Sequence, residues 1–133
     1  GDEIRDKNFV SRLVNLALSG DAHTLKLPYD QYATPVNALD IAKAAYLLLR
    51  DDKNGIYNIA STDFVNRVQL ANLVAKHIPD HNLEFIPIST EELNPPAKRP
   101  LTGGLITAKF LAEYPDFDFT NVDDYLKEKL QNK

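Results

Sequence analysis

The most apolar stretch of the chain runs from Ala38 to Leu49, directly after a polar loop. Only Asp40 and Lys43 are charged in it, and the apolar side chains cover most of a helix circumference instead of one stripe. Asn37 is the predicted N-cap, with Asp40 three residues later in a capping-box arrangement. A helix that is apolar all round is normally buried on more than one side, so we expect this helix to be covered from two directions.

Narrower apolar stripes and their end signals predict the other helices. Helical spacing of apolar residues indicates a helix from about Lys7 to Ser19, with Gly20 as its C-cap. A capping box of Asn66 and Gln69 begins a further helix, which Pro79 ends. Shorter helices are predicted after a Ser89 and Glu92 capping box, at 108–114 and at 121–131.

Three stretches have the pattern of strands: Thr24–Leu27, Ile56–Ala60 and Leu83–Ile88. The second of these is too apolar for an exposed edge and needs neighbours on both sides. The remaining elements are too few to cover both this strand and the helix at 38–49. We therefore expect the chain to self-associate, with Leu47, Leu48, Tyr57 or Ile59 buried against another copy.

Length and composition are those of an ordinary globular domain. The chain has 133 residues, of which 44% are hydrophobic and 26% charged, and we interpret residues 1–133 as a single domain. A net charge of -4 with no basic cluster argues against a nucleic-acid or membrane partner, and no apolar run has the length of a spanning helix. A cytoplasmic protein is the default expectation. The chain begins at Gly1 and contains no methionine, so we expect it to be a piece of a longer protein.

Several catalytic and metal-binding patterns are weak or absent. The five glycines have no spacing that makes a dinucleotide-binding turn, so no cofactor is expected in this chain. Tyr125 and Lys129 match a Tyr-x-x-x-Lys pair literally, but they lie in a charged terminal helix, where a solvated amphipathic face is the better interpretation. His77 and His81 are separated by Pro79, which interrupts the helix that would align them on a metal.

Two polar segments are the candidate binding residues. Asp30 and Gln31 on a loop supply an acceptor and a donor for a sugar or ribose hydroxyl, or they satisfy backbone groups of a turn. Arg99 lies between Lys98 and Pro100 in an extended segment. Its planar fork suits bidentate contact with a phosphate, and a structural salt bridge is the alternative.

A family resemblance covers most of the chain. Asp30-Gln31-x-x-Thr34-Pro35 followed by Asp40-Ile41-Ala42 resembles a segment of the dTDP-4-dehydrorhamnose reductases. Further agreement, in the same order along the chain, comes from Asn8-Phe9-Val10, from Gly55-Ile56-Tyr57-Asn58-Ile59, and from Ala97-Lys98-Arg99-Pro100 with Leu105 and Lys109-Phe110. The chain departs from the family at Ala33, where Gly is usual, at Val36, where Thr is common, and at Leu101–Gly104, where the family has Asn-Ser after Arg-Pro.

The resemblance implies an α/β fragment of α+β character. It would be the C-terminal substrate-binding part of an extended short-chain dehydrogenase/reductase, without the glycine-rich Rossmann half. The implied ligand is a nucleotide sugar, a dTDP-sugar in the first place, with Asp30, Gln31, Thr34, Lys98 and Arg99 as substrate-binding residues. The parent would be an NAD(P)-dependent oxidoreductase, and this chain alone is predicted to be inactive.

Two other interpretations remain open from the sequence. The regulatory beta subunit of methionine adenosyltransferase resembles the same family, so the parent could be a non-catalytic protein-binding member. An independent interaction domain without a ligand is the second alternative. The feature that would separate an enzyme from a regulatory member, an intact Tyr-x-x-x-Lys in a Rossmann half, lies outside this sequence.

Overall fold

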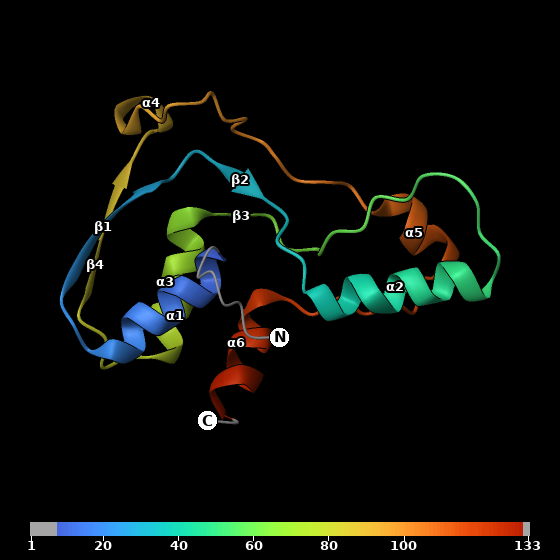
Figure 1. Ribbon diagram of the computed structural model, residues 1–133, viewed down its shortest axis with the longest axis horizontal. Coiled ribbons are helices and arrows are strands. Elements are labelled where there is room, and N and C mark those ends of the chain that lie inside the picture. The colour runs from blue at the N-terminus through green and yellow to red at the C-terminus, as the bar shows by residue number, and fades with distance from the viewer. Residues whose placement is uncertain (1–7, 132–133) are drawn as a thin grey trace.

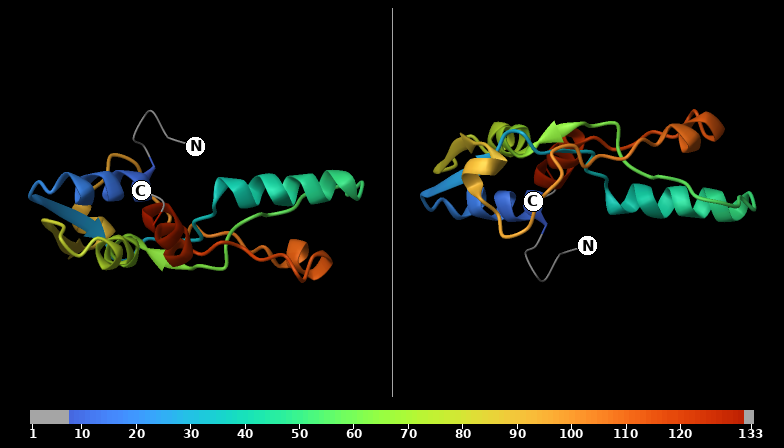
Figure 2. Two further views of the ribbon diagram at one scale, coloured as in Figure 1. Left: turned by 90° about the horizontal axis from the view of Figure 1, so that it is seen from below. Right: turned by 90° about the horizontal axis from the view of Figure 1, so that it is seen from above.

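The computed structural model describes residues 8–131, which form an elongated molecule of helices and short strands (Figure 1). Two regions lie end to end along its long axis (Figure 2). In chain order the elements are α1 (Phe9–Ser19), β1 (His23–Pro28), β2 (Tyr32–Ala33), α2 (Ala38–Arg50), β3 (Val65–Asn66), α3 (Arg67–His77), β4 (Leu83–Ile88), α4 (Thr90–Leu93), α5 (Ala108–Glu113) and α6 (Val122–Gln131).

The first region is built around β1 and β4, which pair in parallel with Leu25 opposite Phe85. Thr24 and Lys26 of β1 are exposed, and Leu27 on the alternate face is buried. Helices α1, α3 and α6 complete this region (Figure 1). Its core, called the first cluster below, contains Leu13, Val14, Ala17, Leu27, Leu70, Ala71, Val74, Leu83, Val122 and Leu126.

Most predicted helix ends are confirmed. Gly20 adopts the left-handed conformation, with φ of 73°, that ends α1. Asn66 and Gln69 form the reciprocal capping box of α3, with both bonds at 2.8 Å, and Ser89 and Glu92 form the box of α4. The predicted start of the first helix at Lys7 lies outside the described residues.

The expectation that α2 is buried on more than one side is wrong. Only Asp40 and Ala44 are buried in this helix, and Leu49 is 81% exposed. Asn37 caps the helix by accepting from the Leu39 amide, but the Asp40 carboxylate does not complete a capping box. It is fully buried and accepts from the Thr120 amide at 2.7 Å, since a buried carboxylate needs hydrogen-bond donors.

The predicted strand at 56–60 is also not formed. Within the described residues no strand pairs with this segment, and Ile56 is 84% exposed. Two of its carbonyls are bonded by side chains instead, the Asn58 oxygen by the Thr107 hydroxyl at 2.7 Å and the Ile56 oxygen by the Lys109 ammonium at 3.0 Å. A strand needs a neighbouring backbone, and this part of the chain offers none.

The second region is formed by α2, α5 and the segments beside them (Figure 1). Its core, the second cluster, has Ala44, Phe110 and Phe119 as buried members, with Leu47, Leu48, Tyr57 and Ile59 partly buried against them. Phe110 stacks on Tyr114 at 4.9 Å between centroids and meets Phe117 edge-on at 5.0 Å. The four residues expected to be covered by another copy therefore pack partly within their own chain.

Candidate functional site

One pocket opens on the surface of the first region, and another opens at the border between this region and α2. One, the basic pocket, has a volume of about 450 Å³ and is lined by Asp30, Ser89, Thr90, Glu91, Asn94, Pro95, Lys98, Arg99 and Leu101. Of the five predicted substrate-binding residues, Asp30, Lys98 and Arg99 meet here, and Gln31 and Thr34 do not line the pocket. The polar loop after β1 and the extended segment after α4 thus converge, although they lie far apart in the sequence.

Asp30 and Gln31 hold the start of α4. The Asp30 carboxylate accepts from the Thr90 amide at 3.0 Å and from the Thr90 hydroxyl at 2.6 Å, and Gln31 Nε2 donates to the same hydroxyl at 3.0 Å. The hydrogen bonds from the Thr90 hydroxyl and amide hold the pKa of Asp30 below its usual value. The carboxylate is therefore ionised, and it stabilises one wall of the basic pocket. This contact is long-range in the sequence, whereas the sequence suggested a local hydrogen bond within a turn.

Thr34 has a structural contact of its own. Its hydroxyl accepts from the Leu105 amide at 3.0 Å, and Gly104 lies directly against it. A Cβ on Gly104 would come within 2.9 Å of Thr34 Cγ2, closer than atoms of this kind approach. The lack of a side chain at Gly104 therefore allows the segment after Arg99 to lie close to the segment after β2.

Lys98 and Arg99 are exposed on the rim of the basic pocket. Neither of them makes an ion pair with another residue in the range 8–131, so the salt bridge that the sequence left open for Arg99 is not found there. Two cations without an ion-pair partner at the edge of this pocket suit an anionic ligand. The pocket also contains the carboxylates of Asp30 and Glu91, and its Ser89 and Thr90 hydroxyls donate to Glu92 and Asp30.

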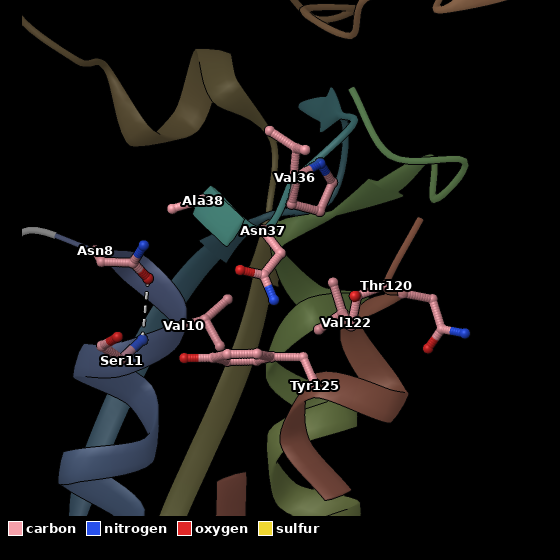
Figure 3. Close-up of a pocket in the computed structure, with 11 residues that line it drawn as sticks. Asn8, Val10, Ser11, Val36, Asn37, Ala38, Thr120, Val122 and Tyr125 are labelled. Atoms are coloured by element: carbon pink, nitrogen blue, oxygen red, sulfur yellow. Dashed lines mark hydrogen bonds between the residues drawn. The ribbon is translucent and has the colours of Figure 1, made fainter. Parts of the chain in front are cut away.

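The other pocket, of about 380 Å³, contains none of the predicted site residues (Figure 3). It lies where the first turns of α1, α2 and α6 approach one another, with Asn37 and Tyr125 pointing toward its centre (Figure 3). Its lining is Asn8, Val10, Ser11, Pro35, Val36, Asn37, Ala38, Thr120, Asn121, Val122 and Tyr125. The Asn8 and Asn37 side chains are used as helix caps, which explains their position without a ligand.

The remaining sequence candidates have structural partners. Lys129 Nζ donates to the Tyr125 hydroxyl at 3.2 Å, one helical turn away on α6. His77 contacts Asp123 at 2.8 Å, and His81 Nδ1 accepts from the Leu83 amide at 3.0 Å. Among the described residues no group of three or more His, Cys, Asp or Glu side chains could hold a metal ion.

The sequence comparison decides the family. The model of the family described as the RmlD substrate binding domain matches residues 3–132. The chain belongs to this family. Among curated proteins, none matches the sequence.

Several solved structures share the fold of this RmlD substrate binding domain. A dTDP-4-dehydrorhamnose reductase of Clostridium acetobutylicum matches 98% of the chain with 24% identity and a TM-score of 0.76. The Bacillus anthracis reductase, solved in complex with NADP, matches 96% with 18% identity and a TM-score of 0.78. A dTDP-glucose 4,6-dehydratase of the same organism, in complex with NAD, matches 95% with 15% identity and a TM-score of 0.73.

The mixed α/β class is thereby confirmed, and the chain matches the C-terminal part of extended short-chain dehydrogenase/reductases. It spans less than half the length of these structures, 45%, 44% and 39% respectively. In the part of the chain that the structure describes, no helix has both the length and the apolar character needed to cross a membrane.

Sequence reasoning missed the wall of the basic pocket formed by Ser89, Thr90, Glu91 and Asn94. A signal for it was present, because the Ser89 and Glu92 capping box places a helix start at this point. The sequence does not reveal that β1 pairs with β4. This pairing places Thr90 next to Asp30.

Proposed function

We propose that this RmlD substrate binding domain is the nucleotide-sugar-binding portion of an NAD(P)-dependent reductase that resembles dTDP-4-dehydrorhamnose reductase. The basic pocket would hold the ligand, with Lys98 and Arg99 on its phosphates. The reduction of a 4-keto sugar nucleotide would belong to the full-length parent, with the nicotinamide cofactor held outside this chain.

The observation that supports the proposal most is the pair of cations without acidic partners at the pocket rim. The chain as a whole is acidic, with a net charge of -4, whereas Lys98 and Arg99 are two adjacent exposed cations that make no ion pair within residues 8–131. Opposite them, Thr90 is held in place by Asp30, which leaves the pocket wall fixed before a ligand arrives. A fixed wall lowers the entropy cost of binding.

The parent's other half would cover α2. Leu39, Ala42, Tyr46 and Leu49 recur at the spacing of one helix face and are all exposed. The segment 56–60 follows this helix in the chain, and no strand of the described residues pairs with it, although side chains bond the carbonyls of Ile56 and Asn58. We propose that a Rossmann half packs on this face and pairs with this segment, which is consistent with a chain of 45% of a relative's length.

Calorimetric titration with dTDP-glucose tests the ligand assignment. We expect saturable binding, weakened about tenfold or more by Lys98→Ala and again by Arg99→Ala, because each removes a charge-assisted contact. Lys127→Ala, an exposed lysine of α6, removes the same charge away from the pocket and should leave the affinity unchanged. Equal loss in all three variants would show a general charge effect and contradict the assignment.

NADPH provides the complementary measurement. The chain lacks the glycine-rich turn that holds a pyrophosphate at a helix start, so its titration with NADPH should give no change in cofactor fluorescence. Saturable micromolar binding of NADPH by the 133-residue chain would contradict the proposal that the cofactor is held outside this chain.

A further inference from the structure

The turn that follows α2 contains the one Asn-Gly pair of the sequence, Asn54 and Gly55. This turn lies at one end of the long axis of the molecule (Figure 1). The Lys53 amide donates to the Leu48 carbonyl at 2.9 Å, which attaches the turn to the helix, and the Asn54 side chain donates to the Asp52 carbonyl at 3.1 Å. The turn is thus well defined, yet Asn54 and Gly55 are both exposed to solvent.

The backbone of the turn explains why glycine stands at position 55. Gly55 has a φ of 102°, a conformation that residues with a side chain rarely adopt. A Cβ at this position would lie 3.6 Å from Lys109 Nζ, which is an ordinary contact, so the conformation and not a lack of space selects glycine. The peptide nitrogen after Asn54 therefore has no side chain beside it that could shield it.

The Gly55 amide is also chemically accessible. Within residues 8–131 it donates no hydrogen bond, and the Asn54 carboxamide makes only the exposed bond to the Asp52 carbonyl, which water can replace. The Lys109 ammonium lies beside the next peptide and donates to the Ile56 carbonyl at 3.0 Å. Its positive charge favours the negative charge that develops on the Gly55 nitrogen when that nitrogen loses its proton.

We infer that Asn54 is a site of spontaneous covalent modification, at which the side chain closes on Gly55 to a succinimide and reopens to isoaspartate. The deprotonated Gly55 nitrogen attacks Asn54 Cγ, the bond from Cγ to Nδ2 breaks, and the side-chain nitrogen leaves as ammonia. Water then opens the ring. Cleavage at Cγ gives aspartate, and cleavage at the backbone carbonyl gives isoaspartate, whose main chain is one carbon longer. Water is the only co-reactant, so no enzyme is needed.

The modification would act on the second region of the molecule. Both products add a negative charge, and isoaspartate also lengthens the chain between α2 and the segment 56–60. Directly after the turn, the Ile56 carbonyl is bonded by Lys109, and the Tyr57 hydroxyl donates to Glu113 at 2.9 Å. A displaced backbone at Gly55 changes both contacts and loosens this segment from α5. The inference stands on the turn alone and is independent of the proposed ligand.

Peptide mapping by mass spectrometry, after incubation at mildly alkaline pH, tests the site. We expect Asn54 to convert to isoaspartate and aspartate at a rate within about threefold of its rate in urea, because the folded turn does not restrain the pair. Asn58 is the internal control: it is exposed in the same segment but precedes Ile59, whose branched side chain hinders attack, and it should stay unchanged. Conversion of Asn54 at least about tenfold slower in the folded chain than in urea would overturn the inference.

Two variants separate the charge from the longer backbone. Asn54→Gln would need a six-membered ring and should stay unmodified, whereas Asn54→Asp supplies the charge alone. In NMR spectra the aged wild-type chain should show shifted Tyr57 and Lys109 signals, with the buried Leu13 and Val74 of the first region unchanged, and Asn54→Asp should show smaller shifts. Identical spectra of the fresh and the aged chain, with isoaspartate confirmed by mapping, would contradict the effect on the second region.

Discussion

The two regions of the molecule are stabilised in different ways. The first region closes around an apolar core in which Leu13, Leu70 and Val74 are almost inaccessible to solvent. The second region has three buried core residues and leaves one face of α2 in solvent. Much of its support is polar: Tyr57 donates to Glu113 at 2.9 Å, and Lys53 pairs with Glu113 at 2.7 Å.

This difference shows which part of the domain is complete within the chain. Burial of apolar surface is the main favourable contribution to folding, so the first region supplies most of the stability. The second region is ordered by aromatic contacts and by hydrogen bonds at its edge, and it keeps an apolar face available. The pocket residues Asp30, Lys98 and Arg99 lie beside the first region, where the pairing of β1 with β4 brings Thr90 to Asp30.

The largest expected effect is a difference in stability between a core substitution in the first region and a surface substitution in the second. Leu13→Ala removes a fully buried side chain of the first cluster and should lower the free energy of unfolding by about 2–5 kcal/mol. Leu49→Ala changes a side chain that is 81% exposed and should stay within about 0.5 kcal/mol. Urea denaturation of both variants measures the difference. Equal losses would show that α2 is covered in solution.

The elements that the sequence predicted well depend on local signals. Capping residues and glycine act within one or two helical turns, so the ends of α1 and α3 could be located from Gly20, Asn66 and Gln69. Strands β1 and β4 followed from short apolar runs bounded by turns. These features do not depend on what the rest of the chain does.

The features that could not be predicted depend on distant partners. The pattern at Ile56–Ala60 is that of a strand, but its pairing partner is absent from the described chain. Asp40 was interpreted as a local cap, although its carboxylate contacts Thr120, eighty residues away. Of the candidate binding residues, Lys98 and Arg99 lie in a segment that the family resemblance singled out.

The second largest effect concerns the contact between the regions. Asp40 is fully buried at the start of α2, and its carboxylate accepts from the Thr120 amide and hydroxyl at 2.7 and 3.3 Å. Asp40→Ala leaves that amide without its partner and should cost about 1.5–3 kcal/mol in unfolding free energy. Asp40→Asn keeps an acceptor oxygen and should cost less. Asp118→Ala, at an exposed position, is the control. An Asp40→Ala variant as stable as this control would contradict the role of Asp40.

A smaller effect is expected on the self-association of the chain. The exposed face of α2 should cause the isolated chain to self-associate at micromolar concentration, because nothing in the described residues covers Tyr46 and Leu49. The double variant Tyr46→Lys and Leu49→Lys should weaken association at least about tenfold, with little change in unfolding free energy. Sedimentation velocity gives the dissociation constant. Ala112→Lys, at an exposed position of α5, is a control for added charge. A monomeric wild-type chain would show that this face is stable in water.

The smallest expected effect is on the pH dependence of the second region. Arg50 donates two bonds to the Asp51 carboxylate, at 2.7 and 2.9 Å, and the Tyr114 hydroxyl donates a third at 2.8 Å. These bonds lower the pKa of Asp51 from 3.8 to about 2. Because the folded-state pKa lies below the unfolded one, the stabilising contribution is complete above about pH 4 and is lost as the pH falls toward 2. The groups are partly exposed, so the change in stability should be slight.

NMR titration of the Asp51 side-chain carboxyl measures this directly, and Tyr114→Phe is its matched variant. Removing the phenol hydroxyl deletes one of the three bonds, so the titration midpoint should rise from about 2 toward 3.8 while the ring keeps its stacking on Phe110. A wild-type midpoint near 3.8 would mean that the end of α2 is not held against α5 in solution. In that case the second region would depend entirely on its covering partner for order, and the contrast with the first region would be sharper still.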